Sequence, residues 1–261
     1  MPKIITIPPS IESYQQLLSP IKVVNRILPI HSLVEKHRHE WGQFVYANSG
    51  VISVVTDTDR YVVPPEQGVL ILPNTNHEVT AITEAELTSF YIDKNMLTPF
   101  PDNSCVLIVN DFLKALINEA KNTNRNYQWS DPDGLLLRLI VRKLALAKKV
   151  KLQLPYPKDK RLLAMLELIQ NTPSSKDKLA QWGKKVGASS RTLSRLFKKE
   201  TGLSYTQWRI RLTIQIAIRK LGSGQPIASI ASELGYESTS AFSYMFKQST
   251  GVSPSFYRNK L

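Results

Sequence analysis

Short apolar runs separated by turn-forming residues characterise the first third of the chain. Between residues 31 and 93, β-branched segments at 43–49, 51–56, 60–63, 69–72, 79–83 and 87–93 are separated by groups of Gly, Pro, Asn or Asp. This punctuation is typical of antiparallel barrels and sandwiches, and no helical segment interrupts it as a parallel βαβ sheet would require. We therefore expect an antiparallel β-barrel over about residues 20–93.

The hydrophobic period becomes helical after residue 93. The segment 111–121 has apolar residues at helical spacing, and Asp111 is placed to cap it. A second helix begins at Asp131, with Pro132 near its first turn, and its apolar residues between 135 and 146 cover more than one face. The surplus face is either buried in the domain's own core or joins a second copy of the chain. We expect the helices within about residues 106–150 to form a homodimer.

A polar run with two prolines at residues 148–157 predicts a linker between two domains. We place the first domain at residues 1–150, the linker at 151–157 and the second domain at 158–261. The second domain is helical and contains a near-repeat, because the segment 179–187 matches the segment 227–235. After each segment come a short turn, a Ser and a helix that ends in Phe-Lys-x-x-Thr-Gly.

Each copy of this repeat predicts a helix-turn-helix unit. A glycine in the turn permits left-handed backbone, and we expect the small Ala180 and Ala228 to let the second helix cross closely. One face of the second helix packs into the core, and the opposite face fits a DNA major groove. The base-contacting residues expected on these faces are Arg191, Thr192, Ser194 and Arg195 in the first copy and Thr239, Ser240, Ser243 and Tyr244 in the second.

These side chains differ in how selectively they read bases. An Arg pairs bidentately with guanine, which is worth roughly 1–3 kcal/mol of discrimination, whereas hydroxyl groups are less selective. The helix at residues 205–221 spans roughly 24 Å, so that the two units reach successive major grooves. Lysines, arginines and helix N-termini suit phosphates, and the expected phosphate contacts are Lys184, Lys185, Ser190, Lys198, Lys199, Arg209, Arg211, Ser238 and Lys247.

Charge follows the same division of the chain. Residues 1–155 contain 16 Lys or Arg and 15 Asp or Glu, a net charge of +1, whereas residues 156–261 contain 18 and 6, a net charge of +12. Such an excess fits a polyanion, and charge alone is also explained by solubility or by anionic lipid. Two tandem motifs inside the basic segment favour double-stranded DNA, bound specifically or, as an alternative, in the manner of a nucleoid protein.

Composition limits the other function classes. No run of 18 apolar residues predicts a transmembrane helix, and the N-terminus lacks the apolar stretch of a signal peptide. Cys105 is the one cysteine, which excludes an intrachain disulfide and a cysteine-based zinc site. We expect a soluble, cytoplasmic protein that does not interact with membranes.

Residues 157–261 resemble the DNA-binding domain of the AraC/XylS family of bacterial transcription regulators. The resemblance is carried by Gly-Ala-Ser-Ser-Arg-Thr-Leu-Ser-Arg-Leu-Phe-Lys at 187–198, by Ile230-Ala231 with Leu234-Gly235-Tyr236, and by Gly251-Val252-Ser253-Pro254 with Tyr257-Arg258. It implies seven helices, two helix-turn-helix units and control of transcription through RNA polymerase. Tyr244 departs from the family, because many relatives have a basic or small residue there.

The first domain has a histidine pattern that resembles the cupin fold, in which a His-x-His and an acid are joined by a later His. His37, His39 and His77 match these positions, but Gln43 stands at the acid position. Three interpretations follow: a divalent metal held by these four residues, a metal-free effector pocket, or histidines satisfied within the fold. Trp41, Phe44 and Tyr46 are placed to line such a pocket.

The stretch 37–46, with 62–65 and 73–77, is similar to an AraC subgroup with short cupin sensors, some of whose members control genes for small-molecule export and drug tolerance. We expect an α+β protein of two domains: a cupin-like antiparallel β-barrel with dimerisation helices, then an all-α domain with two helix-turn-helix motifs. The expected function is transcriptional regulation modulated by a small-molecule effector and without catalysis. The alternatives are a ligand-independent regulator whose barrel only dimerises, and a cupin metalloenzyme fused to a DNA-binding domain.

Overall fold

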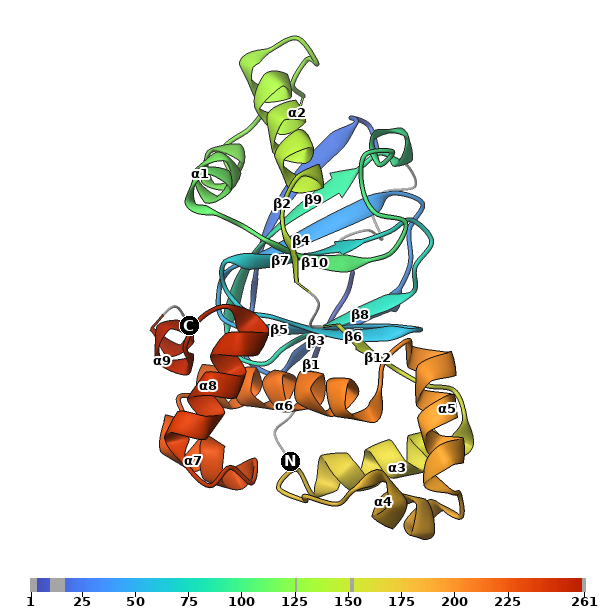
Figure 1. Cartoon of the computed structure of the whole chain (residues 1–261). Coiled ribbons are helices and arrows are strands. Elements are labelled where there is room, and N and C mark those ends of the chain that lie inside the picture. The colour runs from blue at the N-terminus through green and yellow to red at the C-terminus, as the bar shows by residue number, and fades with distance from the viewer. Residues whose placement is uncertain (1–3, 10–16, 125, 151–152, 260–261) are drawn as a thin grey trace. The chain divides into compact units, whose positions relative to one another are not determined.

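The computed structural model describes residues 4–9, 17–124, 126–150 and 153–259, and Figure 1 shows its elements. These residues form two compact units. The first contains the described chain up to residue 150 except Thr58–Arg60, and the second contains Thr58–Arg60 with the described chain from residue 153 onward. Residues 151 and 152 of the predicted linker lie outside the described residues.

Two β-sheets form the body of the first unit. One sheet has the order β1 (Ile5–Ile7), β3 (Ser32–His37), β8 (His77–Ala81), β5 (Ile52–Thr56) and β6 (Asp59–Val63). The other has the order β11 (Lys149–Val150), β10 (Cys105–Ile108), β7 (Gln67–Ile71), β4 (Gly42–Ser49), β9 (Ala85–Ile92) and β2 (Ile21–Leu28). The pairing of β1 with β3 is parallel, whereas β2, β4, β7, β10 and β11 pair antiparallel.

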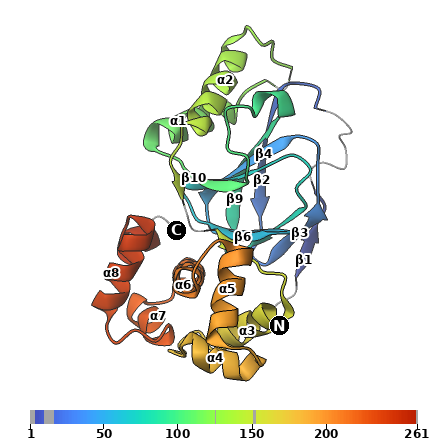
Figure 2. The ribbon, with the colours of Figure 1, turned by 45° about the vertical axis from the view of Figure 1, so that its right-hand side comes forward.

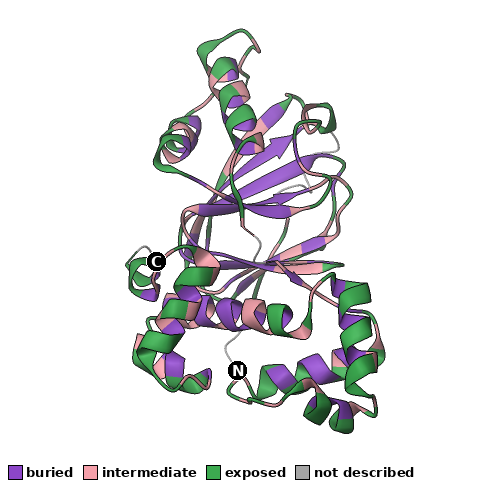
Figure 3. Ribbon diagram, viewed as in Figure 1, coloured by how far each residue is buried: buried purple, intermediate pink, exposed green. Residues whose placement is uncertain are grey.

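Three further elements lie in the first unit: the single-turn helix η1 (Lys94–Met96), α1 (Asp111–Ala120) and α2 (Pro132–Ala145). Figure 2 shows α1 and α2 beside the sheet that contains β4 and β9. The unit therefore has two hydrophobic cores, one between the sheets and one between the second sheet and the helices. Figure 3 shows the buried residues of both.

Strand β4 contributes to both of these cores, because side chains alternate between the two faces of a strand. Val45 and Ala47 lie in the core between the sheets. Phe44 and Tyr46 lie in the core with α1 and α2, and each is at most 1% exposed. The expectation that Phe44 and Tyr46 line a pocket inside the barrel is therefore wrong, and it failed because the alternation was not followed through β4.

The predicted barrel and helices are confirmed, with local corrections. Strand β10 (Cys105–Ile108), which pairs with β7 and β11, occupies the beginning of the range 106–150 in which helices were expected. Helix α1 is capped by Asn110, whose side chain accepts a hydrogen bond from the backbone N–H of Leu113, and Asp111 is the first residue inside the helix. Asp111 thus places its charge in the first turn, where the helix dipole favours it.

Helix α2 has the surplus apolar surface that its sequence predicts. Leu137, Ile140, Val141 and Leu144 are buried in the core that α1 and α2 share with the sheet. On the other side, Leu135 and Leu139 are 53% and 38% exposed, one helical turn apart.

The second unit consists of seven helices over its described residues, together with the short strand β12 (Leu154–Pro155), which pairs with Asp59 and Arg60. The helices are α3 (Lys160–Asn171), α4 (Leu179–Val186), α5 (Ser190–Thr201), α6 (Tyr205–Gly222), α7 (Ile227–Glu233), α8 (Thr239–Thr250) and α9 (Pro254–Arg258). Trp182, Phe197 and Trp208 form the centre of the first core, around α3 to α6. Phe242, Phe246 and Tyr257 are buried in the second half of the unit, where the ring of Phe246 contacts those of the other two.

Part of the predicted linker belongs to this second unit. Leu154 is 1% exposed and lies in the core with Trp182 and Phe197. The indole N–H of Trp208 donates a hydrogen bond of 2.9 Å to the carbonyl of Pro155. A linker ending at residue 157 is therefore too long, because an apolar residue and a carbonyl acceptor near its end are fixed in the folded domain.

Candidate nucleic-acid interface and histidine cluster

The turns of the two helix-turn-helix units have similar local structure. Gly187 ends α4 at φ 67°, and Gly235 lies between α7 and α8 at φ 79°, a left-handed region that favours glycine. Ser189 caps α5 by accepting a hydrogen bond of 3.1 Å from the N–H of Thr192. Ser238 caps α8 through the N–H of Ala241, also at 3.1 Å.

In the first helix-turn-helix unit, the close approach of α4 to the following turn depends on Gly183. A Cβ atom at this position would lie 2.2 Å from the carbonyl oxygen of Ala188 in the following turn. The small residues that we expected to allow this crossing, Ala180 and Ala228, are both exposed. Their place is taken by Gly183 and by its counterpart Ala231, which is 2% exposed.

The outward face of α5 is polar and basic. Arg191, Ser194 and Arg195 are exposed, and Thr192 is half-buried. These four side chains line one open hollow of the surface together with Lys198 and Lys199. The Thr192 hydroxyl lies 2.9 Å from that of Ser189, so it also takes part in the helix cap. Sequence reasoning missed Ser189 as the cap, although it directly precedes the helix.

The outward face of α8 is neutral. Thr239, Ser240 and Tyr244 are exposed, and Ser243 is half-buried. Tyr244 is 70% exposed, so its ring is available to a partner rather than to the core. Lys247 adds a positive charge in the last turn. Helix α5 therefore has arginines available for base recognition, whereas α8 has hydroxyl groups at the corresponding face.

The lysines and arginines expected at phosphates fall into two groups. Lys184, Lys198 and Lys199 are exposed, as are Ser190 and Ser238 near the helix N-termini. Lys198 donates a hydrogen bond of 3.1 Å to the carbonyl of Gly202, which closes the last turn of α5.

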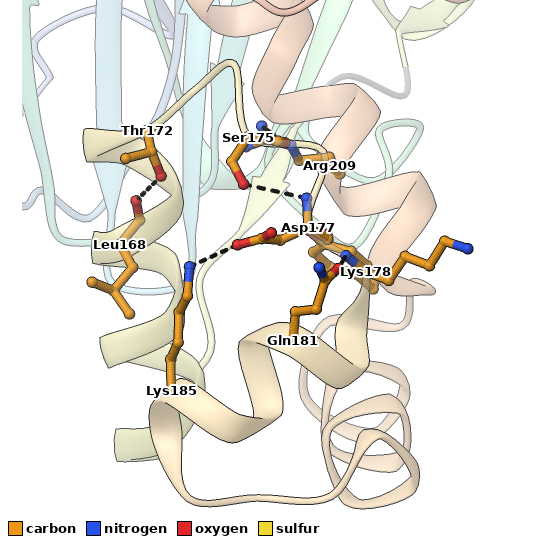
Figure 4. A network of polar contacts seen from close by, with 9 residues as sticks. Leu168, Thr172, Ser175, Asp177, Lys178, Gln181, Lys185 and Arg209 are labelled. Carbon is orange, nitrogen blue, oxygen red and sulfur yellow. Dashed lines mark hydrogen bonds and ion pairs between the residues drawn. The ribbon is translucent and has the colours of Figure 1, made fainter.

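The second group is occupied within the domain, as Figure 4 shows for Lys185 and Arg209. Lys185 forms a 2.7 Å ion pair with Asp177 and holds the pKa of that carboxyl below its usual value. Arg209 donates hydrogen bonds of 2.5 Å and 3.3 Å to the carbonyls of Pro173 and Ser175.

Arg211 is likewise bound, because its guanidinium donates a hydrogen bond of 2.9 Å to the carbonyl of Gln153. Burial lowers the pKa of both Arg209 and Arg211. These two arginines orient backbone segments, and we remove them from the set expected at phosphates. Helical spacing did not indicate this, since their acceptors lie 34 to 58 residues away in the sequence.

In the first unit, three histidines converge at the end of β3. His37 is the last residue of β3 and lies opposite His77, the first residue of β8, with a register shift after Val34. His39 follows in the loop, where its carbonyl accepts a hydrogen bond of 2.7 Å from Asn74. One ring nitrogen from each histidine lies within 4.8 Å of those of the other two. The structure thus brings together the three histidines that the sequence singled out.

Each of these rings is held by a backbone carbonyl. Nδ1 of His37, His39 and His77 lies 2.7 Å, 2.7 Å and 2.8 Å from the carbonyl oxygens of Glu35, Trp41 and Thr75. Burial lowers the pKa of all three, and that of His77 falls to about 3. The rings are therefore neutral near pH 7.

Gln43 and Trp41 complete the surroundings of the cluster. Gln43 is buried on β4, with Oε1 at 3.1 Å from Nε2 of His39 and Nε2 at 3.3 Å from the hydroxyl of Ser89. The Trp41 ring stacks on that of His39 at a centroid distance of 5.3 Å. Ser89 was missed from the sequence, because only the pairing of β4 with β9 brings it to Gln43.

Small cavities are also present among the described residues of the first unit. One, of about 30 Å³, lies between the sheets and is lined by residues that include Arg26, His37, Gln43 and Ser89. Another, of about 180 Å³, is lined by residues of β2 and of the α1–α2 connection, including Lys22 and Tyr127. Pockets for drug-sized ligands usually measure roughly 300–1,000 Å³, so both are small by that standard.

Comparisons with known proteins agree with this two-part organisation. A family described as AraC-like ligand binding domain matches residues 28–107, and one described as Helix-turn-helix domain matches residues 182–260. The HTH-type transcriptional regulator NimR of Escherichia coli (strain K12) is 30% identical over 225 residues, which cover 86% of this chain and 82% of that protein. The chain belongs to the AraC family of transcriptional regulators.

Other known proteins match over smaller parts or at lower identity. The arabinose operon regulatory protein of Escherichia coli (strain K12) is 28% identical over 160 residues, covering 60% of this chain and 53% of that protein. A crystal form of ToxT from Vibrio cholerae has a TM-score of 0.41 at 13% identity, covering 93% of this chain and 99% of ToxT. Over the described residues, no helix is both long and apolar enough to cross a lipid bilayer.

Proposed function

We propose that this AraC-family regulator reads a specific promoter site with α5 and α8 in successive major grooves. The observation that carries this proposal is the exposed face of α5, where two arginines lie beside hydroxyl groups on one open surface. The proposed base contacts are Arg191, Thr192, Ser194, Arg195, Thr239, Ser240, Ser243 and Tyr244. Because its target is chromosomal DNA, we also propose that it acts in the cytoplasm.

Base and phosphate contacts divide between different side chains in this proposal. Arg191 and Arg195 are one helical turn apart, and each is able to pair with the two acceptors of a guanine. Lys184, Lys198 and Lys199 supply charge to the backbone without reading sequence. Lys185 takes part only if it leaves its ion pair with Asp177.

A pair of variants tests this division on an operator selected in vitro with the full chain. Arg191→Ala removes a base contact, so preference for the operator over competitor DNA should fall by about 5- to 150-fold. Lys184→Ala, the matched control, should weaken both DNAs alike and reduce the salt slope by about one unit. If Arg191→Ala weakened both DNAs equally, α5 would not read the sequence.

We further propose that α2 joins two copies of the chain. Leu135 and Leu139 form an apolar strip on its solvent side, and a two-fold interface would bury the strip of each copy against the other. Each DNA-binding domain contains two helix-turn-helix units. A dimer of the chain would bind two neighbouring DNA sites more tightly than it binds one of them alone. Regulation then acts through contact with RNA polymerase, which transcription in vitro from the selected operator tests directly.

The first domain is proposed to bind a small ligand that changes this arrangement. A ligand shifts the balance only if its affinity differs between the two arrangements, so operator affinity must change when the ligand is added. No change with any ligand that binds the domain would instead favour a ligand-independent regulator whose barrel only dimerises.

A further inference from the structure

The hydrogen bonds of the histidine cluster determine which ring nitrogens have free lone pairs. A carbonyl oxygen only accepts, so Nδ1 of His37, His39 and His77 must each carry the proton. In a neutral ring, Nε2 then carries a lone pair. The three carbonyls therefore fix the orientation of the rings and of their Nε2 lone pairs. Metal-binding histidines are commonly held in the same way, by an acceptor that takes the N–H of the other ring nitrogen.

One of these nitrogens lacks a hydrogen-bond partner in the described part of the chain, because Nε2 of His77 is fully buried and unpaired. Nε2 of His39 lies 3.1 Å from Oε1 in the side-chain amide of Gln43. A buried polar atom without a partner destabilises the fold, and a cation bound by the three ring nitrogens would satisfy that of His77.

We propose that His37, His39 and His77 bind one late first-row divalent metal ion, such as Zn²⁺, Co²⁺ or Ni²⁺, through Nε2, with Gln43 as an additional oxygen ligand. Neutral imidazoles suit these ions, and three histidines leave a position for an exchangeable ligand. The inference selects one of the interpretations that the sequence left open, and it deepens the ligand-binding part of the proposed function.

The dimensions of the site fit an ion of this size. Two nitrogens bound to one zinc ion in tetrahedral geometry are about 3.4 Å apart, whereas the three ring nitrogens here lie within 4.8 Å of one another. His37 is the least buried of the three, so its ring has the most room to adjust when an ion binds. The adjoining cavity of about 30 Å³ holds about one water molecule, which suits a hydrated ion.

Metal content of the full, untagged chain tests the proposal. After treatment with a chelator and dialysis against Zn²⁺ or Co²⁺, wild type should retain one ion per chain, measured by mass spectrometry of the metal. His37→Ala should weaken binding by at least about tenfold, because removal of even an outer-shell partner costs about 10- to 100-fold. The control is His31→Asn, since His31 is exposed at φ 63° and Asn tolerates left-handed backbone.

A gain-of-function variant guards against misfolding of a histidine variant. Gln43→Glu replaces a neutral oxygen with a carboxylate, which should tighten binding and shift the visible spectrum of the Co²⁺ form. Wild type that retains no ion, or the same affinity in wild type and His37→Ala, would overturn the proposal. Operator binding by the metal-free chain is measured separately, so that failure of the metal site is distinguishable from failure of DNA recognition.

Discussion

Replacing Gly183 by Ala places two physical effects in opposition. Gly183 lies inside α4 without a left-handed backbone, and Ala is more favourable than Gly in a helix interior by about 1 kcal/mol. However, the new Cβ would lie 2.2 Å from the carbonyl oxygen of Ala188. Ordinary carbon contacts begin at about 3.5 Å, so the turn must move by roughly 1 Å.

The steric effect should be the larger of the two. Overpacking a well-packed site costs about 1–3 kcal/mol, and a backbone oxygen cannot rotate away as a side chain does, which places this variant in the upper half of that range. After the gain in helix propensity, Gly183→Ala should lose about 1–2 kcal/mol of unfolding free energy.

Urea denaturation of the full chain, followed by tryptophan fluorescence, measures this loss, because Trp182 and Trp208 are both buried in the second unit. Ala180→Gly on the exposed side of the same helix is the matched control, and it should lose about 1 kcal/mol from propensity alone. A Gly183→Ala variant more stable than wild type would refute the reasoning, since propensity would then outweigh the contact.

Three further predictions concern Arg209, which is occupied within its domain, and the two proposed interfaces. Arg209→Ala should lose about 1.5–3 kcal/mol of unfolding free energy, because two carbonyls lose a charged donor. The salt dependence of DNA binding by the folded variant, measured by titration, should remain that of wild type. Tyr244→Ala should change stability by less than about 0.5 kcal/mol, because the ring is 70% exposed, yet weaken operator binding in a gel-shift assay. Leu139→Glu should halve the mass measured by sedimentation, whereas Ile27→Glu, at an exposed site on β2, should not; equal masses would exclude α2 from the interface.

Features with local signals were predictable from the sequence. The helix-turn-helix units follow from glycines, capping serines and apolar spacing that lie within about 20 residues of one another. The His-x-His pattern likewise identified His37 and His39, and a third histidine followed by analogy. In each case neighbouring residues carry most of the information.

Features that depend on distant contacts were not predictable in the same way. The strand β10 is recognisable only through its pairing with β7 and β11, since four residues are too few for a clear period. Arg209 looked available to DNA until its acceptors at Pro173 and Ser175 were located. The placement of Tyr46 was recoverable, because it lies three positions after Gln43 and so faces the other side of the strand.

Because β4 is buried on both faces, a structural change on one face of this strand is felt by the core on the other face. Gln43 contacts the histidine cluster on one side of the strand, and the next residue, Phe44, packs in the core beneath α1 and α2 on the other. Close-packed interiors transmit small displacements instead of absorbing them. If the proposed site is occupied, a displacement of Gln43 therefore has to cross only the thickness of one strand to reach Phe44 and the core that it shares with the helices.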